Sequence, residues 1–392
     1  MRPEARYAAA IEVLDAWQDG MAAEQALTRW ARGARYAGSK DRAAVRDHVY
    51  DVLRRKNSCA AHGGGETGRA LILGLLRLGG VDPALIFSGE GHAPSKLSPS
   101  EETAPRNLDI EPLDVKDWML LELDDQRIED QRTLLAAMTS RAEVWLRVNT
   151  RKASPAVSID MLQSEGVLCE PHGNLPAALR VTDGARRVRH TQAYSEGLVE
   201  VQDLSPQMAI ARLDLPQTGR VLDYCAGGGG KALAIAAGTE ASIFAHDAIP
   251  RRMADLPARA TRAGVSIEQI APSDLGNHAP YDLVVTDVPC SGSGTWRRDP
   301  EVKWRLTPER LAELVAVQAG ILDEAAALVA ANGQLVYMTC SLFRAENDAQ
   351  IDGFLARRPG WICTARHFDT PLTASDGFFS AVLARKTDSP DA

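Results

Sequence analysis

The chain has 392 residues, of which 45% are hydrophobic and 24% are charged, and its glycines and prolines are spread along the sequence. This length predicts two or three domains, and the composition excludes the disordered and fibrous classes of protein. The net charge of -8 argues against nonspecific wrapping of nucleic acid by overall charge, so any RNA binding must come from local basic patches.

The first part of the chain is predicted to be helical. Apolar residues between positions 4 and 56 recur at helical spacing, without the alternation that is typical of strands. Residues 62–65 and 88–107 are rich in Gly, Pro, Ser and Glu, which predicts loops or a linker. We therefore expect a small helical module, with its linker, in residues 1–105.

A second piece, residues 106–205, is predicted to combine helix and strand. A helical pattern runs over residues 115–138, and residues 144–149 read as a strand. Basic residues gather in this piece and in the first one, and each is compatible with a solvated surface as well as with phosphate contact. They are Arg29, Arg32, Arg35, Lys40, Arg42, Arg46, Arg54, Arg55 and Lys56, then Arg141, Arg147, Arg151, Lys152, Arg180, Arg186, Arg187 and Arg189.

Beyond residue 205, apolar strands alternate with helices. Strands are predicted at residues 220–223, 242–245, 281–286 and 334–338. This alternation predicts an α/β domain over residues 206–392, with a mostly parallel sheet covered by helices on both faces. Ligands of such sheets bind at the carboxyl ends of the strands.

The first of these strands runs into the glycine-rich segment 224–231, Tyr-Cys-Ala-Gly-Gly-Gly-Gly-Lys, which precedes an alanine-rich helix at residues 232–237. Glycines let a backbone approach a ligand closely, and a new helix presents free N–H groups. A phosphate loop is excluded, because Cys225 and Ala232 occupy positions that require Gly and Ser or Thr. The glycine pattern of a dinucleotide-binding loop is incomplete, because Ala232 stands where its third glycine is required. NAD nevertheless stays open as an alternative cofactor.

Acidic residues follow the next two strands. Asp247 ends the second strand and is placed to accept hydrogen bonds from ribose hydroxyls, although a helix-capping role is also physically sound. Asp274 lies where the third strand is predicted to end. It could accept a hydrogen bond from an adenine amino group.

Six cysteines are present, without the paired spacing of a zinc site or the density of a disulfide scaffold. We expect reduced thiols and no metal. Cys290 and Cys340 follow two of the predicted strands, which would place both thiols in one crevice. A lone buried cysteine is usually a small hydrophobic residue, but two at strand ends point to chemistry.

Methylation of cytosine at carbon-5 would explain such a pair. Carbon-5 is a poor nucleophile, so a thiolate must first add at carbon-6, and a second basic group can then assist loss of the carbon-5 proton. Lys231 and Arg297 are candidate cations for stabilising the thiolate. Asp287 is expected to hydrogen-bond the base.

Over nearly the whole chain, the sequence resembles the Nop/Sun-domain RNA cytosine-5 methyltransferases, and most closely their bacterial small-subunit ribosomal RNA branch. The family's cofactor loop, D-x-C-A-A-P-G-G-K-T, is matched by residues 223–232, except that Gly227 and Gly228 replace Ala-Pro and Ala232 replaces Thr. A second motif, D-x-P-C-S-G-x-G-x-x-R-R-x-P-E/D-x-K-W, is matched by residues 287–304. A third, Y-x-T-C-S, is matched by residues 337–341 and is followed by Glu346 and Asn347.

The resemblance implies an S-adenosylmethionine-dependent enzyme that methylates cytosine in RNA, with ribosomal RNA as the expected substrate. It implies a Rossmann-like class I methyltransferase domain with a seven-stranded sheet, preceded by an α+β RNA-binding subdomain and a NusB-like helical module. Cys340 is implied as the nucleophile and Cys290 as the thiol that assists release, with Asp287 beside them. The predicted cofactor-binding residues are Cys225, Ala226, Gly227, Gly228, Gly229, Gly230, Lys231, Asp247, Arg252, Asp274 and Asp287.

We further expect a cytoplasmic monomer that has no membrane segment. Two other functions stay open. One is an RNA-binding ribosome assembly factor with weak or lost methyltransferase activity, suggested by the altered loop at Gly227, Gly228 and Ala232. The other is a small-molecule methyltransferase, which would need neither the helical module nor the basic patches.

Overall fold

The structure is a computed structural model that describes residues 1–103, 112–123 and 130–386. Two compact units form within it. The helical unit comprises Met1–Leu121, Ile128–Arg141 and Trp296–Leu306, and the sheet unit comprises Glu122–Arg127, Ala142–Thr295 and Thr307–Ala392. The predicted domain boundary between residues 105 and 106 lies outside the described residues, as do parts of the predicted linker and of the helix predicted at 115–138.

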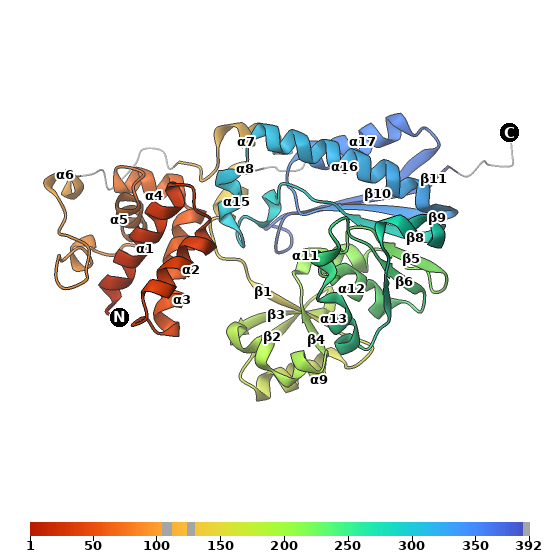
Figure 1. Ribbon diagram of the computed structural model, residues 1–392, viewed down its shortest axis with the longest axis horizontal. Coiled ribbons are helices and arrows are strands. Elements are labelled where there is room, and N and C mark those ends of the chain that lie inside the picture. Colours follow the sequence, from red (N-terminus) through yellow and green to blue (C-terminus); the bar gives the residue numbers. More distant parts are fainter. Residues whose placement is uncertain (104–111, 124–129, 387–392) are drawn as a thin grey trace. The chain divides into compact units, whose positions relative to one another are not determined.

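Five helices build the core of the helical unit (Figure 1). They are α1 (Pro3–Gln18), α2 (Ala23–Gly33), α3 (Ser39–Arg54), α4 (Lys56–Gly63) and α5 (Gly68–Leu78). Val13, Leu53 and Leu71 are buried together between them, which confirms the helical pattern predicted for residues 4–56. Shorter elements follow: η1 (Pro83–Leu85), α6 (Pro99–Glu102), α7 (Asp117–Glu122) and α8 (Gln131–Ala137).

The loop predicted at residues 62–65 starts later than expected, because its first two residues form the end of α4. A Cβ on Gly63 would lie 1.8 Å from the carbonyl oxygen of Ala70. One on Gly74 would lie 1.8 Å from the carbonyl oxygen of Cys59. Helices α4 and α5 therefore pack backbone to backbone, and the glycine that suggested a loop permits this contact.

Helix α15 (Pro300–Arg305) belongs to the helical unit, although it lies within the sequence of the predicted catalytic domain. Glu301 accepts a hydrogen bond from Nε1 of Trp17 at 3.2 Å. Nε1 of Trp304 donates to the carbonyl oxygen of Leu53 at 2.6 Å. The helical unit is therefore discontinuous in sequence.

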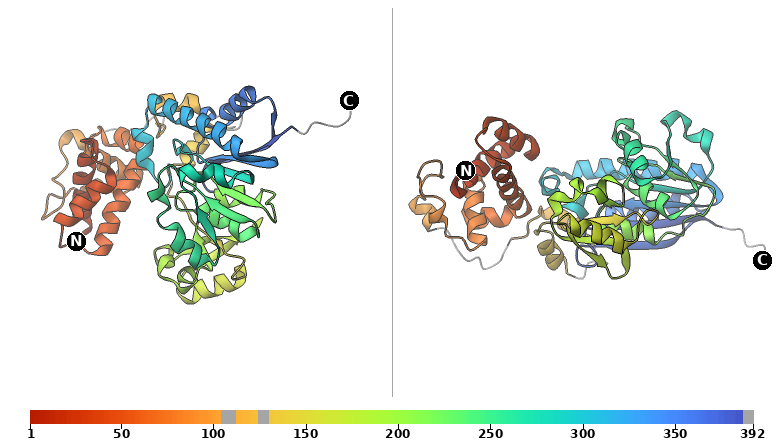
Figure 2. Two further views of the ribbon diagram at one scale, coloured as in Figure 1. Left: turned by 45° about the vertical axis from the view of Figure 1, so that its right-hand side comes forward. Right: turned by 90° about the horizontal axis from the view of Figure 1, so that it is seen from below.

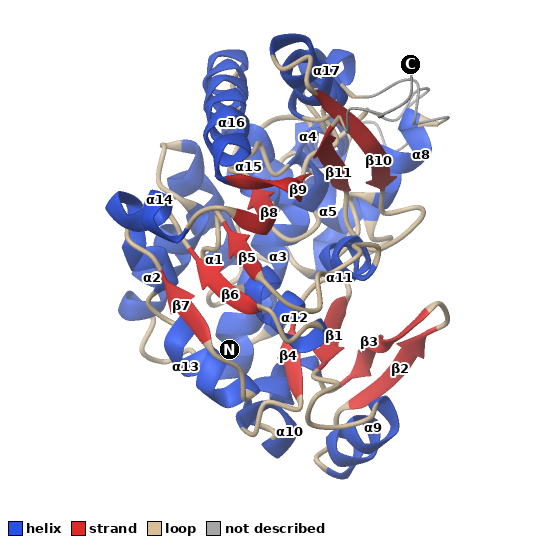
Figure 3. Cartoon of the chain, turned by 90° about the vertical axis from the view of Figure 1, so that its right-hand side faces the viewer, coloured by secondary structure: helices blue, strands red, loops and turns tan. Residues whose placement is uncertain are grey.

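The sheet unit begins with a small antiparallel sheet of strand order β2-β3-β1-β4 (Figure 3). Its strands are β1 (Val144–Val148), β2 (Leu168–His172), β3 (Leu175–Asp183) and β4 (Val199–Val201). Leu146, Leu162 and Val199 share its core with residues of α9 (Pro155–Ser164), η2 (Ala185–His190) and α10 (Gln192–Ser195). The strand predicted at residues 144–149 is confirmed.

A seven-stranded sheet of order β10-β11-β9-β8-β5-β6-β7 forms the rest of the unit. The strands are β5 (Arg220–Asp223), β6 (Ser242–Ala245), β7 (Ile267–Gln269), β8 (Tyr281–Asp287), β9 (Val329–Thr339), β10 (Trp361–Asp369) and β11 (Phe378–Arg385). β11 is antiparallel to both neighbours, whereas the other pairs are parallel. The predicted mostly parallel, seven-stranded Rossmann-like sheet is confirmed.

Successive residues of the central strands face opposite sides of this sheet, as strand geometry requires. Tyr337 packs with α16 and α17 on one side, and Val336 packs with α11 and α12 on the other. Figures 1 and 2 show these two helical layers. The helices that follow the small sheet in this unit are α11 (Leu204–Ala211), α12 (Gly230–Gly238), α13 (Leu256–Ala263), α14 (Leu275–His278), α16 (Pro308–Leu328) and α17 (Asp348–Arg357).

Candidate active site

The glycine-rich loop leaves the carboxyl end of β5 and enters α12. Gly227 and Gly229 have φ angles of 49° and 77°, in the region that favours glycine. A Cβ on Gly229 would lie 2.2 Å from Cδ1 of Leu256, so packing also requires glycine there. The backbone N of Ala226 donates to the carbonyl oxygen of His246 at 2.8 Å. The loop is therefore fixed to the edge of the sheet.

Asp247, at the end of β6, holds the same loop. Its Oδ2 accepts a hydrogen bond from the backbone N of Gly227 at 3.0 Å, and its Oδ1 accepts one from Ile249 at 2.8 Å. Arg252 lies 3.5 Å from Oδ2. This carboxylate therefore shapes its own turn and the loop together. An ionised carboxylate has about four acceptor positions, so a further bond to a ribose hydroxyl is compatible with these contacts.

Arg259 is a loop contact that sequence reasoning missed. Its guanidinium donates to the carbonyl oxygen of Gly228, where the family pattern has proline. Glu200 on β4 lies 3.3 Å from Arg259 and also accepts a hydrogen bond from Arg262 at 2.6 Å. The loop thus gains a side-chain anchor at one of its altered positions. No motif pointed to Arg259, because it lies on α13, well beyond the loop in sequence.

Lys231 and Asp287 form an ion pair at the carboxyl ends of the central strands. Burial alone would lower the pKa of Lys231, but the charge of Asp287 and the hydrogen bond to it outweigh burial and raise the pKa. Lys231 also interacts electrostatically with Cys340. Of the two cations proposed from sequence, Lys231 is therefore placed to favour a thiolate.

Arg297, the other proposed cation, belongs to the helical unit. Its side chain donates to the carbonyl oxygen of Arg141 at 3.1 Å. Its own carbonyl oxygen accepts a hydrogen bond from Nε of Arg54 at 2.8 Å. These contacts anchor Arg297 within that unit.

Asp223 was part of the loop motif but had no predicted role. It is buried, and its Oδ2 accepts a hydrogen bond from the backbone N of Ala232 at 3.0 Å. Its Oδ1 has no hydrogen-bond partner within the described part of the chain. Burial raises the pKa of Asp223 to about 7, opposed by Lys231 and reinforced by Asp287.

Cys225 and Asp274 were also predicted to bind the cofactor. Cys225 lies against the core of the sheet, and Asp274 lies in an exposed turn. Cys225 packs against the core of the seven-stranded sheet, and burial, followed by the charge of Asp223, raises the pKa of its thiol. Asp274 does not end the third strand as predicted, because β7 ends at Gln269. It lies in the exposed turn η4 (Pro272–Asp274), where Pro272 has no N–H group to continue strand pairing.

The two cysteines predicted to share a crevice do lie together. Their Sγ atoms are 3.4 Å apart, since Cys290 follows β8 and Cys340 follows its neighbour β9. The hydrogen bond to Cys340, followed by burial, raises the pKa of Cys290 well above its usual value. Either thiol can be the donor in this hydrogen bond, so the two sulfur atoms are close enough to share a proton.

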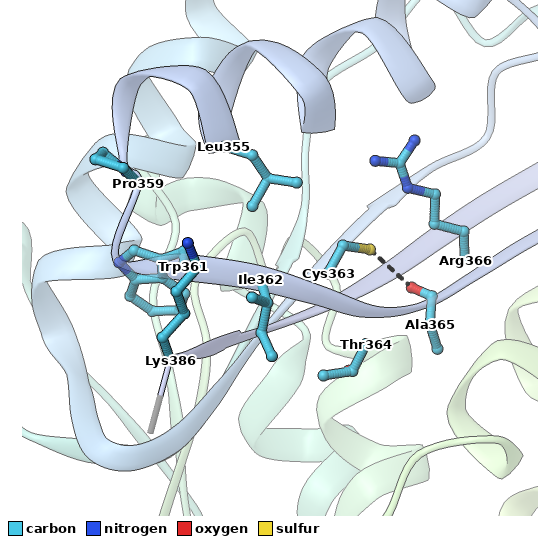
Figure 4. Close-up of a pocket in the computed structure, with 9 residues that line it drawn as sticks. All are labelled: Leu355, Pro359, Trp361, Ile362, Cys363, Thr364, Ala365, Arg366 and Lys386. Atoms are coloured by element: carbon cyan, nitrogen blue, oxygen red, sulfur yellow. Dashed lines mark hydrogen bonds between the residues drawn. The ribbon is translucent and has the colours of Figure 1, made fainter. Parts of the chain in front are cut away.

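A groove of about 720 Å³ lies elsewhere in the sheet unit, along edge strand β10 (Figure 4). Its lining residues are Leu355, Pro359, Trp361, Ile362, Cys363, Thr364, Ala365, Arg366 and Lys386. The thiol of Cys363 donates to the carbonyl oxygen of Ala365 at 3.3 Å. No predicted site residue is among those that line this groove.

Metal ligands and membrane spans were also sought in the described residues. Across 1–103, 112–123 and 130–386, no group of His, Cys, Asp and Glu side chains could hold a metal ion. In those same ranges, no helix combines the length and the apolar character that crossing a membrane would require.

Comparison with known proteins finds matches to the parts of the sequence that form the two sheets. The profile of the family described as 16S rRNA methyltransferase RsmB/F matches residues 210–385, and the profile of an RsmF/B-like ferredoxin-like domain matches residues 116–188. Ribosomal RNA small subunit methyltransferase B of Salmonella arizonae is 32% identical over 286 residues, which cover 69% of this chain and 66% of the relative. A probable ribosomal RNA small subunit methyltransferase B of Synechocystis is 32% identical over 277 residues, which cover 68% of this chain and 62% of the relative. The matched region thus spans slightly less than two thirds of the length of these relatives.

The crystal structure of PH0851 has the same fold, with a TM-score of 0.76 at 21% identity, over 98% of this chain and 99% of that one. The two family profiles match successive regions of the chain, and the sequence relatives carry the same family name. The chain belongs to the RsmB/F methyltransferase family.

Proposed function

We propose that this chain transfers a methyl group from S-adenosylmethionine to carbon-5 of a cytosine in ribosomal RNA, through a covalent bond between Cys340 and the base. The observation that carries this proposal is the pair of thiols, 3.4 Å apart at the ends of neighbouring strands. The ribosomal substrate follows from the names of the relatives.

The carboxyl edge of the seven-stranded sheet fits this cofactor. S-adenosylmethionine supplies an activated methyl group and carries positive charge on its sulfonium and its ammonium. The carboxyl groups of Asp223, Asp247 and Asp287 are close enough to interact electrostatically, which gathers hydrogen-bond acceptors for the cofactor at this edge. Oδ1 of Asp223 is a buried acceptor without a hydrogen-bond partner in the described residues. The residues that would hold the cofactor are Asp223, the loop residues 225–231, Asp247, Arg252, Asp274 and Asp287.

The surroundings of the thiols favour Cys340 as the nucleophile. The raised pKa of Cys290 favours this thiol as the proton donor of the pair, while Lys231 supplies positive charge near Cys340. Cys340 is therefore the sulfur that adds to carbon-6 of a base flipped from its stack, which makes carbon-5 nucleophilic. Asp287, which forms an ion pair with Lys231, accepts a hydrogen bond from the amino group of the base.

The contact between Cys290 and Cys340 also determines the order of the steps in the proposed reaction. The hydrogen bond to Cys340 is the largest cause of the raised pKa of Cys290. Once Cys340 is bonded to carbon-6, this largest cause is gone and the pKa of Cys290 falls, so that Cys290 can release its proton to solvent. The Cys290 thiolate then removes the carbon-5 proton, the double bond between carbon-5 and carbon-6 re-forms, and Cys340 leaves as a thiolate.

Cysteine variants test this proposal in cells that lack the chain. Cys340→Ala should give no methylation when small-subunit ribosomal RNA is analysed by bisulfite sequencing, and no covalent adduct on denaturing gels. Cys290→Ala should accumulate the adduct, and Cys363→Ala, outside the pair, should behave as wild type. Methylation by Cys340→Ala at the wild-type rate would refute the assignment. A wild-type chain that binds RNA but neither binds S-adenosylmethionine in calorimetry nor methylates would instead be an assembly factor.

A further inference from the structure

A single buried carboxylate accepts hydrogen bonds from both of the turns that carry the cysteines. Glu346, at the end of η6 (Arg344–Glu346), is 0% exposed. Its Oε1 accepts hydrogen bonds from the backbone N of Ser291 at 2.7 Å and from Nε2 of Gln318 at 2.9 Å. Its Oε2 accepts hydrogen bonds from the hydroxyls of Ser291 and Ser341. These two serines directly follow Cys290 and Cys340, so Glu346 ties one turn to the other.

The neighbouring residues on both turns are held as well. Nε2 of Gln318, on α16, also donates to the carbonyl oxygen of Pro289 at 3.0 Å. Asn347 accepts a hydrogen bond from Oγ1 of Thr339 at 2.6 Å and donates one to the carbonyl oxygen of Ser341 at 2.9 Å. The residues on either side of each cysteine are thus fixed by buried side chains.

We propose that Glu346 is a positioning residue that keeps the sulfur atoms of Cys290 and Cys340 in contact. Its side chain accepts four hydrogen bonds, two on each carboxyl oxygen. A glutamine has nearly the same shape, but its NH₂ group must face two of these donors. The role in methylation rests on the proposed function, whereas the geometry of the two thiols can be measured without RNA.

The measurement uses the full chain, equilibrated with reduced and oxidised glutathione. The protein dithiol reacts with one glutathione disulfide to give a Cys290–Cys340 disulfide and two molecules of glutathione, and peptide mass spectrometry quantifies this disulfide. The equilibrium constant gives the effective concentration of one thiol at the other. Glu346→Gln should lower it at least about tenfold, the equivalent of losing one buried hydrogen bond, and should lower kcat for RNA similarly with KM unchanged.

Two further variants keep the test decisive. Ser341→Ala removes one donor to the carboxylate, together with the acceptor of the backbone N of Phe343, so it should lower the effective concentration at least about threefold even if Glu346→Gln does not fold. Asp348→Asn is the matched control. Asp348 is also buried, but it accepts a hydrogen bond from Arg366 on β10 at 2.6 Å. This control should stay within about twofold of wild type.

The outcomes separate this inference from the proposed function. Wild-type effective concentrations in both Glu346→Gln and Ser341→Ala would overturn the positioning role, even if the wild-type chain methylates RNA. A wild-type chain that does not methylate, but whose high effective concentration is lost in Glu346→Gln, would leave the positioning role standing and refute the proposed function.

Discussion

Lys231 pairs with Asp287 and interacts electrostatically with Cys340, so one buried ammonium serves both the carboxylate and the proposed nucleophile. Replacing Lys231 by Met removes this positive charge and disfavours the thiolate. We expect the rate at which iodoacetamide alkylates Cys340 at about pH 7 to fall roughly tenfold, as followed by mass spectrometry of the peptide. Lys152→Met is the control, since Lys152 donates to the carbonyl oxygen of Glu196. An unchanged rate in Lys231→Met would assign the activation of Cys340 to another group.

Asp247 and Asp274 are expected to differ in their effect on cofactor affinity. Asp247→Ala removes a buried acceptor that holds both Gly227 and Ile249, so the loop itself should lose its shape. We expect the Kd for S-adenosylmethionine to rise at least about fiftyfold by calorimetry, because two backbone donors lose their partner. Asp274→Ala, in an exposed turn, should raise it only about fivefold. Equal effects of the two substitutions would contradict this ranking.

The pKa of Asp223 predicts how stability depends on pH. Burial raises this pKa from 3.8 to about 7, so in the range between these values the unfolded chain ionises at this position while the folded chain does not. The free energy of unfolding should therefore lose about 1.4 kcal/mol per pH unit across this range through Asp223, and nothing further above it.

Asp223→Asn removes this titration and retains an acceptor for the backbone N of Ala232. Its stability relative to wild type, from urea unfolding without cofactor, should rise with pH and level off above about pH 7. Asp282→Asn, which alters a more exposed carboxylate at the start of β8, should show no such trend. A difference between Asp223→Asn and wild type that is independent of pH would show that Asp223 ionises normally in the folded chain.

Glu301 is expected to stabilise the helical unit. It accepts hydrogen bonds from Nε1 of Trp17 and from the backbone N of Ala23. Glu301→Ala leaves both donors without this partner, which should cost about 1–3 kcal/mol for each group that stays buried. Hydrogen exchange should become faster in α1 and α2, while the seven-stranded sheet keeps its protection. Glu309→Ala alters an exposed residue in the first turn of α16. It should change hydrogen exchange neither in α1 and α2 nor in the seven-stranded sheet.

Much of the fold is readable from the sequence, and the exceptions have physical causes. Strands β5 and β6 are short apolar runs that are buried on the sheet, so their bounds could be predicted. The edge strand β10 is mostly half-exposed and carries a weak apolar signal, which is why no prediction covered it. The third strand was expected to reach Asp274, but a proline stops it earlier.

The residues of the candidate site also divide into those that could be predicted from the sequence and those that could not. The proximity of Cys290 and Cys340 could be predicted, because each follows a strand and neighbouring parallel strands end at one edge. Arg259 and Glu346 could not be assigned a role, since each acts through a contact with residues distant along the chain. Such contacts depend on tertiary packing and leave no local pattern.

The late position of α15 determines when the helical unit can be completed during synthesis. A ribosome makes the chain from its N-terminus, so α1 to α5 emerge well before α15. Until residues 301 and 304 have been made, Nε1 of Trp17 lacks its acceptor and the carbonyl oxygen of Leu53 lacks its indole donor. The helical unit is therefore finished only after β5, the glycine-rich loop and the turn that carries Cys290 have been translated.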